Sequence, residues 1–256
     1  MADAKPDRVI AYVDGFNLYH GIVAGGFGRY KWLNIHALAA NLLDPGQQLV
    51  KTKYFTARLA GPRPADRKEY AKELEARRKR QNNFLEAIGT IPEVEIFYGH
   101  YQEKPMECRK CSHTWMGWEE KMSDVAIATE LLVDTFSSSY DTALIISGDG
   151  DLVPPIKVVR KLFGHKKIYV SFPPERFATS LQQSCHKLVD SVHGGNLSVC
   201  QLPEEVTLPS KYVLRRPVEW TDAWIKKKEK ETAAKLASKN AADFRMPKRS
   251  KYGGNS

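Results

Sequence analysis

The sequence predicts an α/β protein built on a central, mainly parallel sheet. Short apolar runs of strand length recur between residues 8 and 172, and segments with a helical pattern of about 10–20 residues separate them. Parallel strands joined by helices are buried on both faces, so they appear as continuous apolar runs. The 256 residues suffice for one such domain and an appendage, and the chain shows no internal repeat.

The first predicted elements are strand Arg8–Val13, helix Ile35–Leu43, strand Lys51–Leu59, helix Asp66–Ile88 and strand Val94–Tyr101. The opening strand, RVIAYV, is almost uniformly apolar and ends at an Asp-Gly pair, which is typical of a buried strand that stops at a turn. The long helix is amphipathic, with Leu74, Leu85 and Ile88 on one side and the run Arg77–Arg80 on the other.

The remaining elements of the domain are helix Ser123–Phe136, strand Ala143–Ser147, helix Leu152–Phe163, strand Lys167–Phe172 and helix Arg176–Val192. On the first of these helices the main apolar stripe is predicted at Val125, Ala128, Leu132 and Phe136. The strand ALIIS leads directly into an acidic loop that contains glycine, GDGD.

Residues 203–256 lack this alternation, so we divide the chain into a domain at 1–202 and an appendage at 203–256. Prolines at 203, 209 and 217 suit an extended strap, Thr221–Asn240 suits a lone, largely polar helix, and the final KRSKYGGNS has a disordered composition. Residues 211–256 hold 13 Lys and Arg against 5 Asp and Glu, so +8 of the net charge of +9 lies there. Such a basic tail either binds a polyanion such as RNA or only keeps the chain in solution.

Several protein classes are disfavoured by the composition. No apolar run approaches the roughly 20 residues needed to cross a bilayer. The first residues lack the pattern of a secretory signal, and four cysteines do not suggest a disulfide framework. We therefore expect a cytoplasmic protein without membrane contact.

Three aspartates follow two of the predicted strands. Asp14 comes directly after RVIAYV, and Asp149 and Asp151 lie in the loop after ALIIS. Ligand crevices lie outside the carboxyl ends of the strands in such sheets, so the three carboxylates are expected at one place. Carboxylates held close repel one another unless a cation relieves the conflict, and Mg²⁺ prefers oxygen ligands. The pattern predicts a Mg²⁺ or Mn²⁺ site.

A fourth aspartate, Asp124, lies on the helix Ser123–Phe136. At about 100° per residue it borders the apolar stripe, in line with Leu131 and Thr135, which places its carboxylate near the buried side. Glu130 falls about 240° further round the helix, beside Asp134, so these two acids are expected to point elsewhere.

Each acid also has a purely structural explanation. Asp14 and Asp149 suit turns, whereas Asp151 and Asp124 suit the beginnings of helices. The joint placement of all four is what favours a site.

Two neighbours complete the candidate set as substrate-binding residues. Asn17 either orients a phosphate or a metal-bound water, or merely begins a helix. Lys121 either contacts a phosphate or the carboxylates, or is a solvated lysine at the end of a helix.

Cys108 and Cys111 form a C-x-x-C pair inside a predicted insertion at about residues 102–120. Such a pair is half of a tetrahedral zinc site and needs two further ligands, and no second C-x-x-C occurs in the chain. A structural zinc site with borrowed ligands, a loop with two free thiols, and a pair shared across a homodimer all stay open.

Three segments together resemble the NYN domain family of PIN-like nucleases: VDGFN at 13–17, EEKMSDVAIA at 119–128 and SGDGDLVPPIKVVRKLFG at 147–164. The resemblance covers roughly residues 8–193, and CQLPEEV at 200–206 is similar to an extension of some bacterial members. It implies a three-layer PIN-like fold and a divalent-metal ribonuclease site, with the family's acids at Asp14, Asp124, Asp149 and Asp151. Some PIN-like sites place another acid where this chain has Glu130.

These residues together predict a metal-dependent endoribonuclease that acts on single-stranded RNA without a protein nucleophile, with Mg²⁺ or Mn²⁺ activating water. A structure-specific DNA or RNA nuclease is one alternative, and a nucleic-acid-binding regulator with little activity is another. The chain has no Walker or G-x-G-x-x-G fingerprint for a nucleotide cofactor and no D-x-D-x-T motif of phosphatases.

Overall fold

A central sheet organises the computed structural model, which describes residues 5–61, 68–108 and 110–245. Its strands run in the order β4-β3-β2-β1-β5-β6-β7, and every neighbouring pair is parallel except β3 and β4. Their bounds are β1 Asp7–Asp14, β2 Gln47–Ala57, β3 Val94–Glu107, β4 Thr114–Lys121, β5 Thr142–Ile146, β6 Lys167–Ser171 and β7 Lys187–Leu188. The predicted mainly parallel sheet is confirmed.

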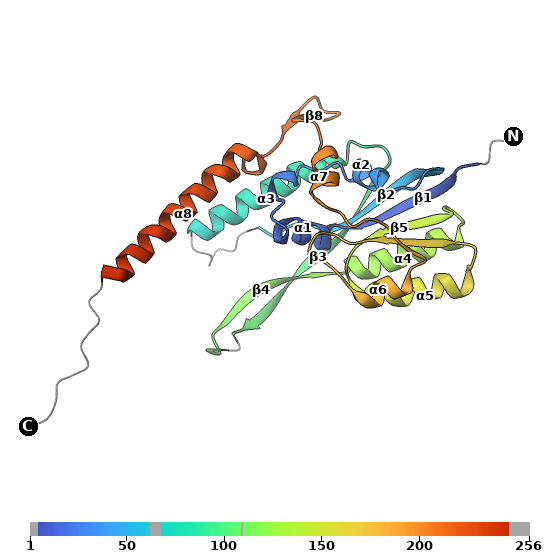
Figure 1. Ribbon diagram of the computed structural model, residues 1–256, viewed down its shortest axis with the longest axis horizontal. Helices are drawn as coiled ribbons and strands as arrows, with labels where there is room; N and C mark the ends of the chain where they lie inside the picture. The colour runs from blue at the N-terminus through green and yellow to red at the C-terminus, as the bar shows by residue number, and fades with distance from the viewer. Residues whose placement is uncertain (1–4, 62–67, 109, 246–256) are drawn as a thin grey trace, which may run out of the picture.

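Helices cover both faces of the sheet and complete three layers (Figure 1). One face carries α1 Gly15–Ala24, α2 Ile35–Asn41, α3 Lys68–Ile88 and α7 Gly194–Val199, and the other carries α4 Ser123–Phe136, α5 Val153–Leu162 and α6 Thr179–Ser184. Strand β1 packs against both helix layers, because Val9 and Val13 belong to one hydrophobic cluster while Ile10 and Tyr12 belong to the other. This alternation explains why the strand is apolar throughout.

The strand order reverses beside β1. From β1 the chain builds β2 and β3 on one side, then crosses to β5 and β6 on the other. The carboxyl ends of β1 and β5 therefore form the point at which the topology switches, which is where ligands bind in open α/β sheets.

The predicted insertion is a long β-hairpin. Strand β3 continues to Glu107, well beyond the expected end at Tyr101, and β4 pairs with it from His100 opposite Lys121 to Glu107 opposite Thr114. Residues 102–107 are exposed, so they lack the apolar pattern by which we recognise strands, and backbone pairing alone extends them.

The predicted helix at Arg176–Val192 is wrong. Helix α6 spans only Thr179–Ser184, where the Ser184 hydroxyl donates to the carbonyl of Ser180. The backbone then becomes extended, His186 donates its N–H to Ile168, and β7 pairs with β6. Pairing with the edge of the sheet thus overrides the helical pattern of the sequence.

The apolar stripe predicted on α4 is also wrong. The buried side chains of this helix are Ser123, Ile127, Leu131, Asp134 and Thr135. Of the predicted stripe, Val125 is 66% exposed and Phe136 67% exposed, while Ala128 and Leu132 are only half-buried. The buried face therefore lies on the side of Asp124, in agreement with the predicted alignment of this residue with Leu131 and Thr135.

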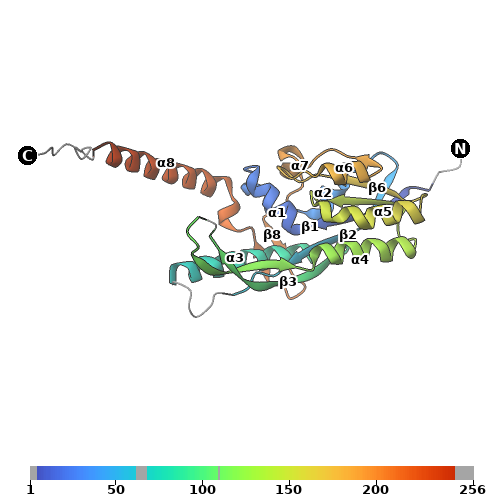
Figure 2. The same cartoon turned by 90° about the horizontal axis from the view of Figure 1, so that it is seen from below.

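The strap after residue 202 packs on the domain. It contains the small hairpin β8 Glu205–Thr207 and β9 Val213–Arg215, and Trp220 is buried near Trp32 with 6.3 Å between ring centroids. Helix α8 then runs from Asp222 to Arg245, somewhat longer than predicted, and projects from the body (Figures 1 and 2). The predicted disorder of residues 248–256 falls outside the described residues. None of the described helices is long and apolar enough to cross a membrane.

Candidate active site

Asp14 is the buried centre of the candidate site. It ends β1 and caps α1, and only 4% of its surface is exposed. One carboxylate oxygen accepts the backbone N–H of Asn17 at 2.9 Å, and the other accepts the hydroxyl of Ser147 at 2.8 Å. Asp14 therefore has a structural role as a helix cap, but this role occupies only one of its two oxygens.

Hydrogen bonds tie the end of β1 to the loop after β5. The side-chain carbonyl of Asn17 accepts the N–H of Gly148 at 3.0 Å, and the Ser147 hydroxyl accepts the N–H of Asp149 at 3.1 Å. Asp149 in turn accepts the N–H of Asp151 at 2.9 Å. Asn17 thus links the first turn of α1 to the loop after β5. Asp151, in that loop, is exposed.

Asp124 faces this loop from the first turn of α4. Its carboxylate is half-buried, and among the described residues it has no hydrogen bond and no ion pair. Burial raises its pKa, and the nearby charges of Asp149 and Asp151 raise it further. An acid in such surroundings favours either a proton or a cation.

The same conflict acts on Asp14. Burial raises its pKa to about 7, against the opposing effect of the hydrogen bonds from Asn17 and Ser147, and the charges of Asp124 and Glu120 add to the rise. Asp124 therefore interacts with Asp14 on one side and with Asp149 and Asp151 on the other.

Two members of this group are absent from the set predicted by sequence. Ser147 is fully buried between Asp14 and Asp149. Glu120, on β4, accepts the hydroxyl of Ser123, and its pKa is raised by burial and by Asp124. An acid and a hydroxyl three residues apart at the start of a helix would have been a usable signal for Glu120.

The donor chemistry fits Mg²⁺ or Mn²⁺. Within the described parts of the chain, no three His, Cys, Asp or Glu side chains meet closely enough to surround one ion directly. The acids do raise one another's pKa, and they offer oxygen donors only. Because Mg²⁺ keeps several of its waters, carboxylates that do not surround an ion directly can still hold it partly through water.

Glu130 and Asp134 lie elsewhere, as predicted. Both bind the buried ammonium of Lys53, at 2.6 and 2.7 Å, and Asp134 also accepts the hydroxyl of Tyr12 at 2.6 Å. The two acids share this one ammonium between α4 and the sheet, so they have a cationic partner that Asp124 lacks among the described residues.

The close approach of α1 to β2 explains the glycine after Asp14. A Cβ atom on Gly15 would lie 2.6 Å from the Phe55 carbonyl oxygen and from the Tyr54 ring. A larger residue would push the first turn of α1, and with it Asp14, away from the sheet.

The C-x-x-C pair lies at the tip of the β3–β4 hairpin. Cys108 hydrogen-bonds to Cys111, and the N–H groups of Lys110 and Cys111 point at its sulfur, which lowers the pKa of the Cys108 thiol. Among the described residues no further ligand joins the pair in a metal cluster. The half-buried Lys121, at the other end of β4, pairs in register with His100 beside α4.

Comparison with known proteins assigns most of the chain to a family. The model of the NYN domain matches residues 8–193. The chain is 26% identical over 246 residues to 6-hydroxy-3-succinoylpyridine 3-monooxygenase HspA of Pseudomonas putida, covering 85% of this chain and 77% of that protein. A solved structure of a protein of unknown function from Vibrio parahaemolyticus is similar with a TM-score of 0.44 and 16% identity, covering 74% of this chain and 96% of that one.

Proposed function

The chain belongs to the NYN domain family, a PIN-like nuclease family, and from that premise we propose that it is a divalent-metal-dependent endoribonuclease acting on single-stranded RNA. The observation that carries the proposal is the half-buried Asp124, which faces Asp149 and Asp151 without a cationic partner among the described residues. Acids in this state are expected where a metal ion completes the site.

The proposed ligands are Asp14, Asp124, Asp149 and Asp151. When bound, Mg²⁺ or Mn²⁺ supplies positive charge for the scissile phosphate and lowers the pKa of an attacking water. Ser147 and the backbone N–H of Asn17 hold both oxygens of Asp14 in fixed directions, so the carboxylate cannot turn away from the loop after β5. The second hydrogen bond of Asn17, to Gly148, keeps that loop against α1.

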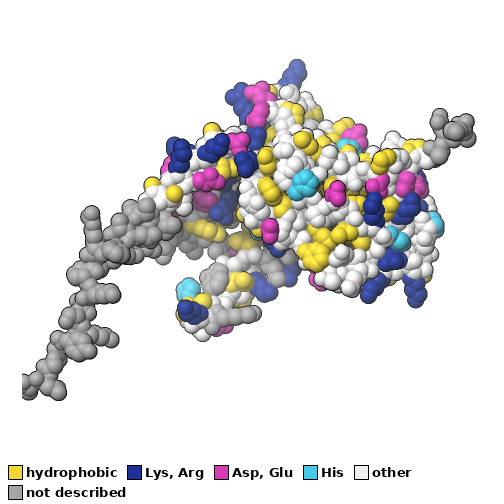
Figure 3. Space-filling view, viewed as in Figure 1, with side chains coloured by type: hydrophobic (Ala, Val, Ile, Leu, Met, Phe, Trp, Pro, Cys, Tyr) yellow, Lys and Arg dark blue, Asp and Glu magenta, His cyan; other side chains and the backbone are white. Residues whose placement is uncertain are grey.

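Basic side chains near the carboxyl ends of the strands support an RNA substrate. Lysines of the first part of α8 are exposed, namely Lys226, Lys227, Lys228 and Lys230, and Figure 3 shows the dark blue side chains along this helix. Helix α8 and the β3–β4 hairpin both project from this end of the sheet, so a strand that passes between them reaches the acids (Figures 1 and 2). The free thiols of the four cysteines agree with a cytoplasmic location.

Incubation with labelled single- and double-stranded RNA and DNA tests the proposal. We expect internal cleavage of single-stranded RNA with Mn²⁺ or Mg²⁺ and none in excess EDTA. Preferential cleavage of branched duplex substrates would indicate a structure-specific nuclease, and tight binding without cleavage would indicate a regulator.

A second candidate follows from the similarity to HspA, whose name describes a monooxygenase for a substituted pyridine. The observation in its favour is a cavity with aromatic walls beside the acids. Oxygenation needs dioxygen and an electron donor, whereas hydrolysis needs neither. Oxygen uptake with NADH and a hydroxypyridine carboxylic acid, in the absence of RNA cleavage, would favour this candidate.

A further inference from the structure

A cavity of about 880 Å³ lies beside the acids, at the carboxyl ends of β1 and β2. Its walls come from α1, α3, the β3–β4 hairpin, the strap and the first turn of α8. Gly15 and Glu120 line it, so it is continuous with the neighbourhood of Asp14. Its size lies in the range of roughly 300–1,000 Å³ that is usual for small-molecule sites.

Aromatic rings dominate the lining: Phe16, Tyr19, Tyr54, Phe84, Tyr101, Trp220 and Trp224. The inner rings pack on one another, with Phe84 6.1 Å from Tyr54 and 6.4 Å from Trp220 between centroids. Phe16 and Tyr19, on α1, are 44% and 46% exposed. Rings that are fixed at the floor and open at the rim offer flat faces to a planar ligand.

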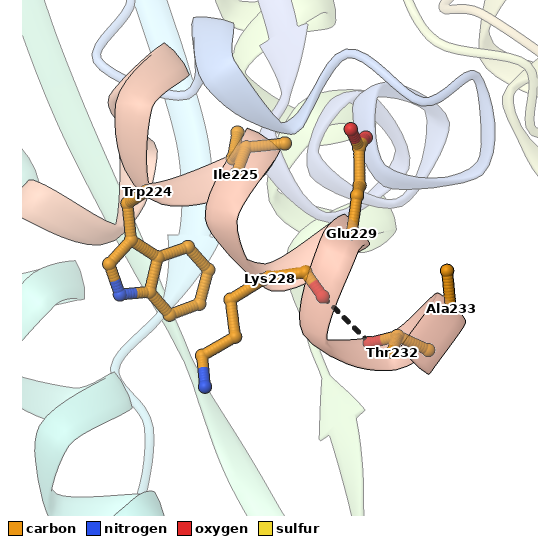
Figure 4. Close-up of a pocket in the computed structure, with 6 residues that line it drawn as sticks. All are labelled: Trp224, Ile225, Lys228, Glu229, Thr232 and Ala233. Carbon is orange, nitrogen blue, oxygen red and sulfur yellow. Dashed lines mark hydrogen bonds between the residues drawn. The ribbon is translucent and has the colours of Figure 1, made fainter. Parts of the chain in front are cut away.

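Trp224, in the first turn of helix α8, lines the cavity. Trp224 and Lys228 extend from the same side of this helix, with the ammonium 5.6 Å from the ring centroid, while Ile225 and Glu229 point the other way (Figure 4). This helix belongs to the basic appendage. It therefore contributes both an aromatic side chain to the cavity and exposed lysines beside it.

Cations gather on one wall. Arg77 is paired with Glu73 at 3.1 Å and Arg80 with Glu219 at 2.7 Å. Lys31 has no ion pair among the described residues, and its ammonium lies 5.1 Å from the centroid of the Tyr19 ring. The other charged side chains at the cavity are Glu69, Lys72 and Glu120, with His20 beside them. Lys31 is therefore a cation of this wall that no carboxylate pairs with among the described residues.

The surroundings of Lys31 favour an anionic ligand. Burial lowers its pKa, and the like charges of Arg80 and Arg77 lower it further. An anion placed between these side chains would relieve their repulsion and form charge-assisted hydrogen bonds.

We propose that this cavity binds a planar aromatic ring that carries an anionic group, with the ring beside Tyr19 and Phe16 and the anion at Lys31. This site goes beyond the proposed nuclease activity and holds whether or not the chain cuts RNA. The same chemistry comes from two sources, a nucleobase with its phosphate in an RNA strand and a small aromatic carboxylate.

Calorimetric titration of the full chain without divalent metal tests the site. The ligands are adenosine monophosphate, adenosine, nicotinate and inorganic phosphate. We expect adenosine monophosphate or nicotinate to bind more tightly than adenosine or phosphate alone, because only these two combine ring and anion. Binding of the nucleotide only identifies a nucleic-acid strand as the source, and binding of nicotinate only identifies a small aromatic acid.

Two variants assign the parts of the site. Lys31→Gln should weaken the anionic ligands about tenfold and leave adenosine unchanged, because it removes one charge-assisted contact. Tyr19→Leu should weaken adenosine and the nucleotide alike by roughly tenfold, because it removes a stacking face. Lys157→Gln, on the exposed side of α5, is the control.

Thermal unfolding of each variant verifies that the fold is intact. The proposal is overturned if none of the ligands binds, if phosphate binds as tightly as the nucleotide, or if Lys31→Gln binds like the control. Failure of RNA cleavage would leave this result unaffected, since the titration contains no metal.

Discussion

Replacing Asp14 by asparagine should stabilise the protein at alkaline pH. Burial raises the pKa of Asp14 from 3.8 to about 7, so the ionised carboxylate opposes folding. At roughly 1.4 kcal/mol per pH unit, the cost reaches about 4 kcal/mol above pH 7. Asparagine keeps an oxygen for the N–H of Asn17, and the Ser147 hydroxyl can accept from its amide, so most of this energy should be regained.

The gain should depend on pH with a definite sign. In the folded protein Asp14 holds its proton up to about pH 7, whereas in the unfolded chain it loses the proton near pH 3.8. The wild-type protein therefore loses stability from this group as pH rises between these values, and the variant does not. We expect no gain for Asp14→Asn at pH 4 and a gain of up to about 4 kcal/mol at pH 8, or roughly 8–16 °C in Tm.

Urea unfolding at pH 4, 6 and 8 measures this difference, and Asp141→Asn is the matched control. Arg8 lowers the pKa of Asp141 to about 2, so its ionised form stabilises the fold above pH 3.8 and this stability is lost as pH falls through about 2. That variant should therefore be less stable at pH 8. Equal effects of Asp14→Asn at pH 4 and pH 8, or no gain at pH 8, would refute the reasoning from burial.

Three further predictions concern other parts of the chain. Lys53→Met should cost roughly 3–5 kcal/mol in urea unfolding, because it leaves the carboxylates of Glu130 and Asp134 without their shared cation; unchanged stability would contradict this ion pair. The purified monomer should contain no zinc by metal analysis, because the described residues bring only Cys108 and Cys111 together, and about one zinc per chain would show the opposite. Deletion of residues 235–256 removes six Lys and Arg and keeps Trp224, so RNA affinity should fall, and its salt slope should flatten by about 0.7 for each phosphate that the tail no longer neutralises. An unchanged slope would exclude the tail from RNA binding, and cleavage at saturating RNA should persist.

Much of the fold was predictable because its strands are buried on both faces. Continuous apolar runs such as RVIAYV identify parallel strands. The sequence places Asp14 and Asp149 after two of these strands, at the end of a parallel sheet where ligands bind. That β1 and β5 are neighbours, which brings the acids together, required the strand order.

The wrong predictions concern strands at the edge of the sheet and a helix with apolar residues on its exposed side. The residues of β3 beyond Tyr101 and the short β7 are strands because a neighbouring backbone pairs with them, and their side chains carry little pattern. On α4, hydrophobicity alone favoured Val125 and Phe136 over the buried Thr135, whose hydroxyl bonds within the helix and to Tyr140. The cavity forms where α1, α3, the β3–β4 hairpin, the strap and the first turn of α8 pack together, and no local pattern of the sequence contains this packing.

The most direct test of the proposed site is Mn²⁺-dependent cleavage of an end-labelled single-stranded RNA by the wild-type protein, Asp149→Asn and Glu130→Gln. Each variant removes one carboxylate charge: Asp149→Asn at the strand end, and Glu130→Gln at the ion pair with Lys53. We predict no cleavage in excess EDTA, a loss of at least about a hundredfold in Asp149→Asn, and activity within severalfold of the wild type in Glu130→Gln. Full cleavage in EDTA, or a larger loss in Glu130→Gln than in Asp149→Asn, would contradict a metal site at the ends of β1 and β5.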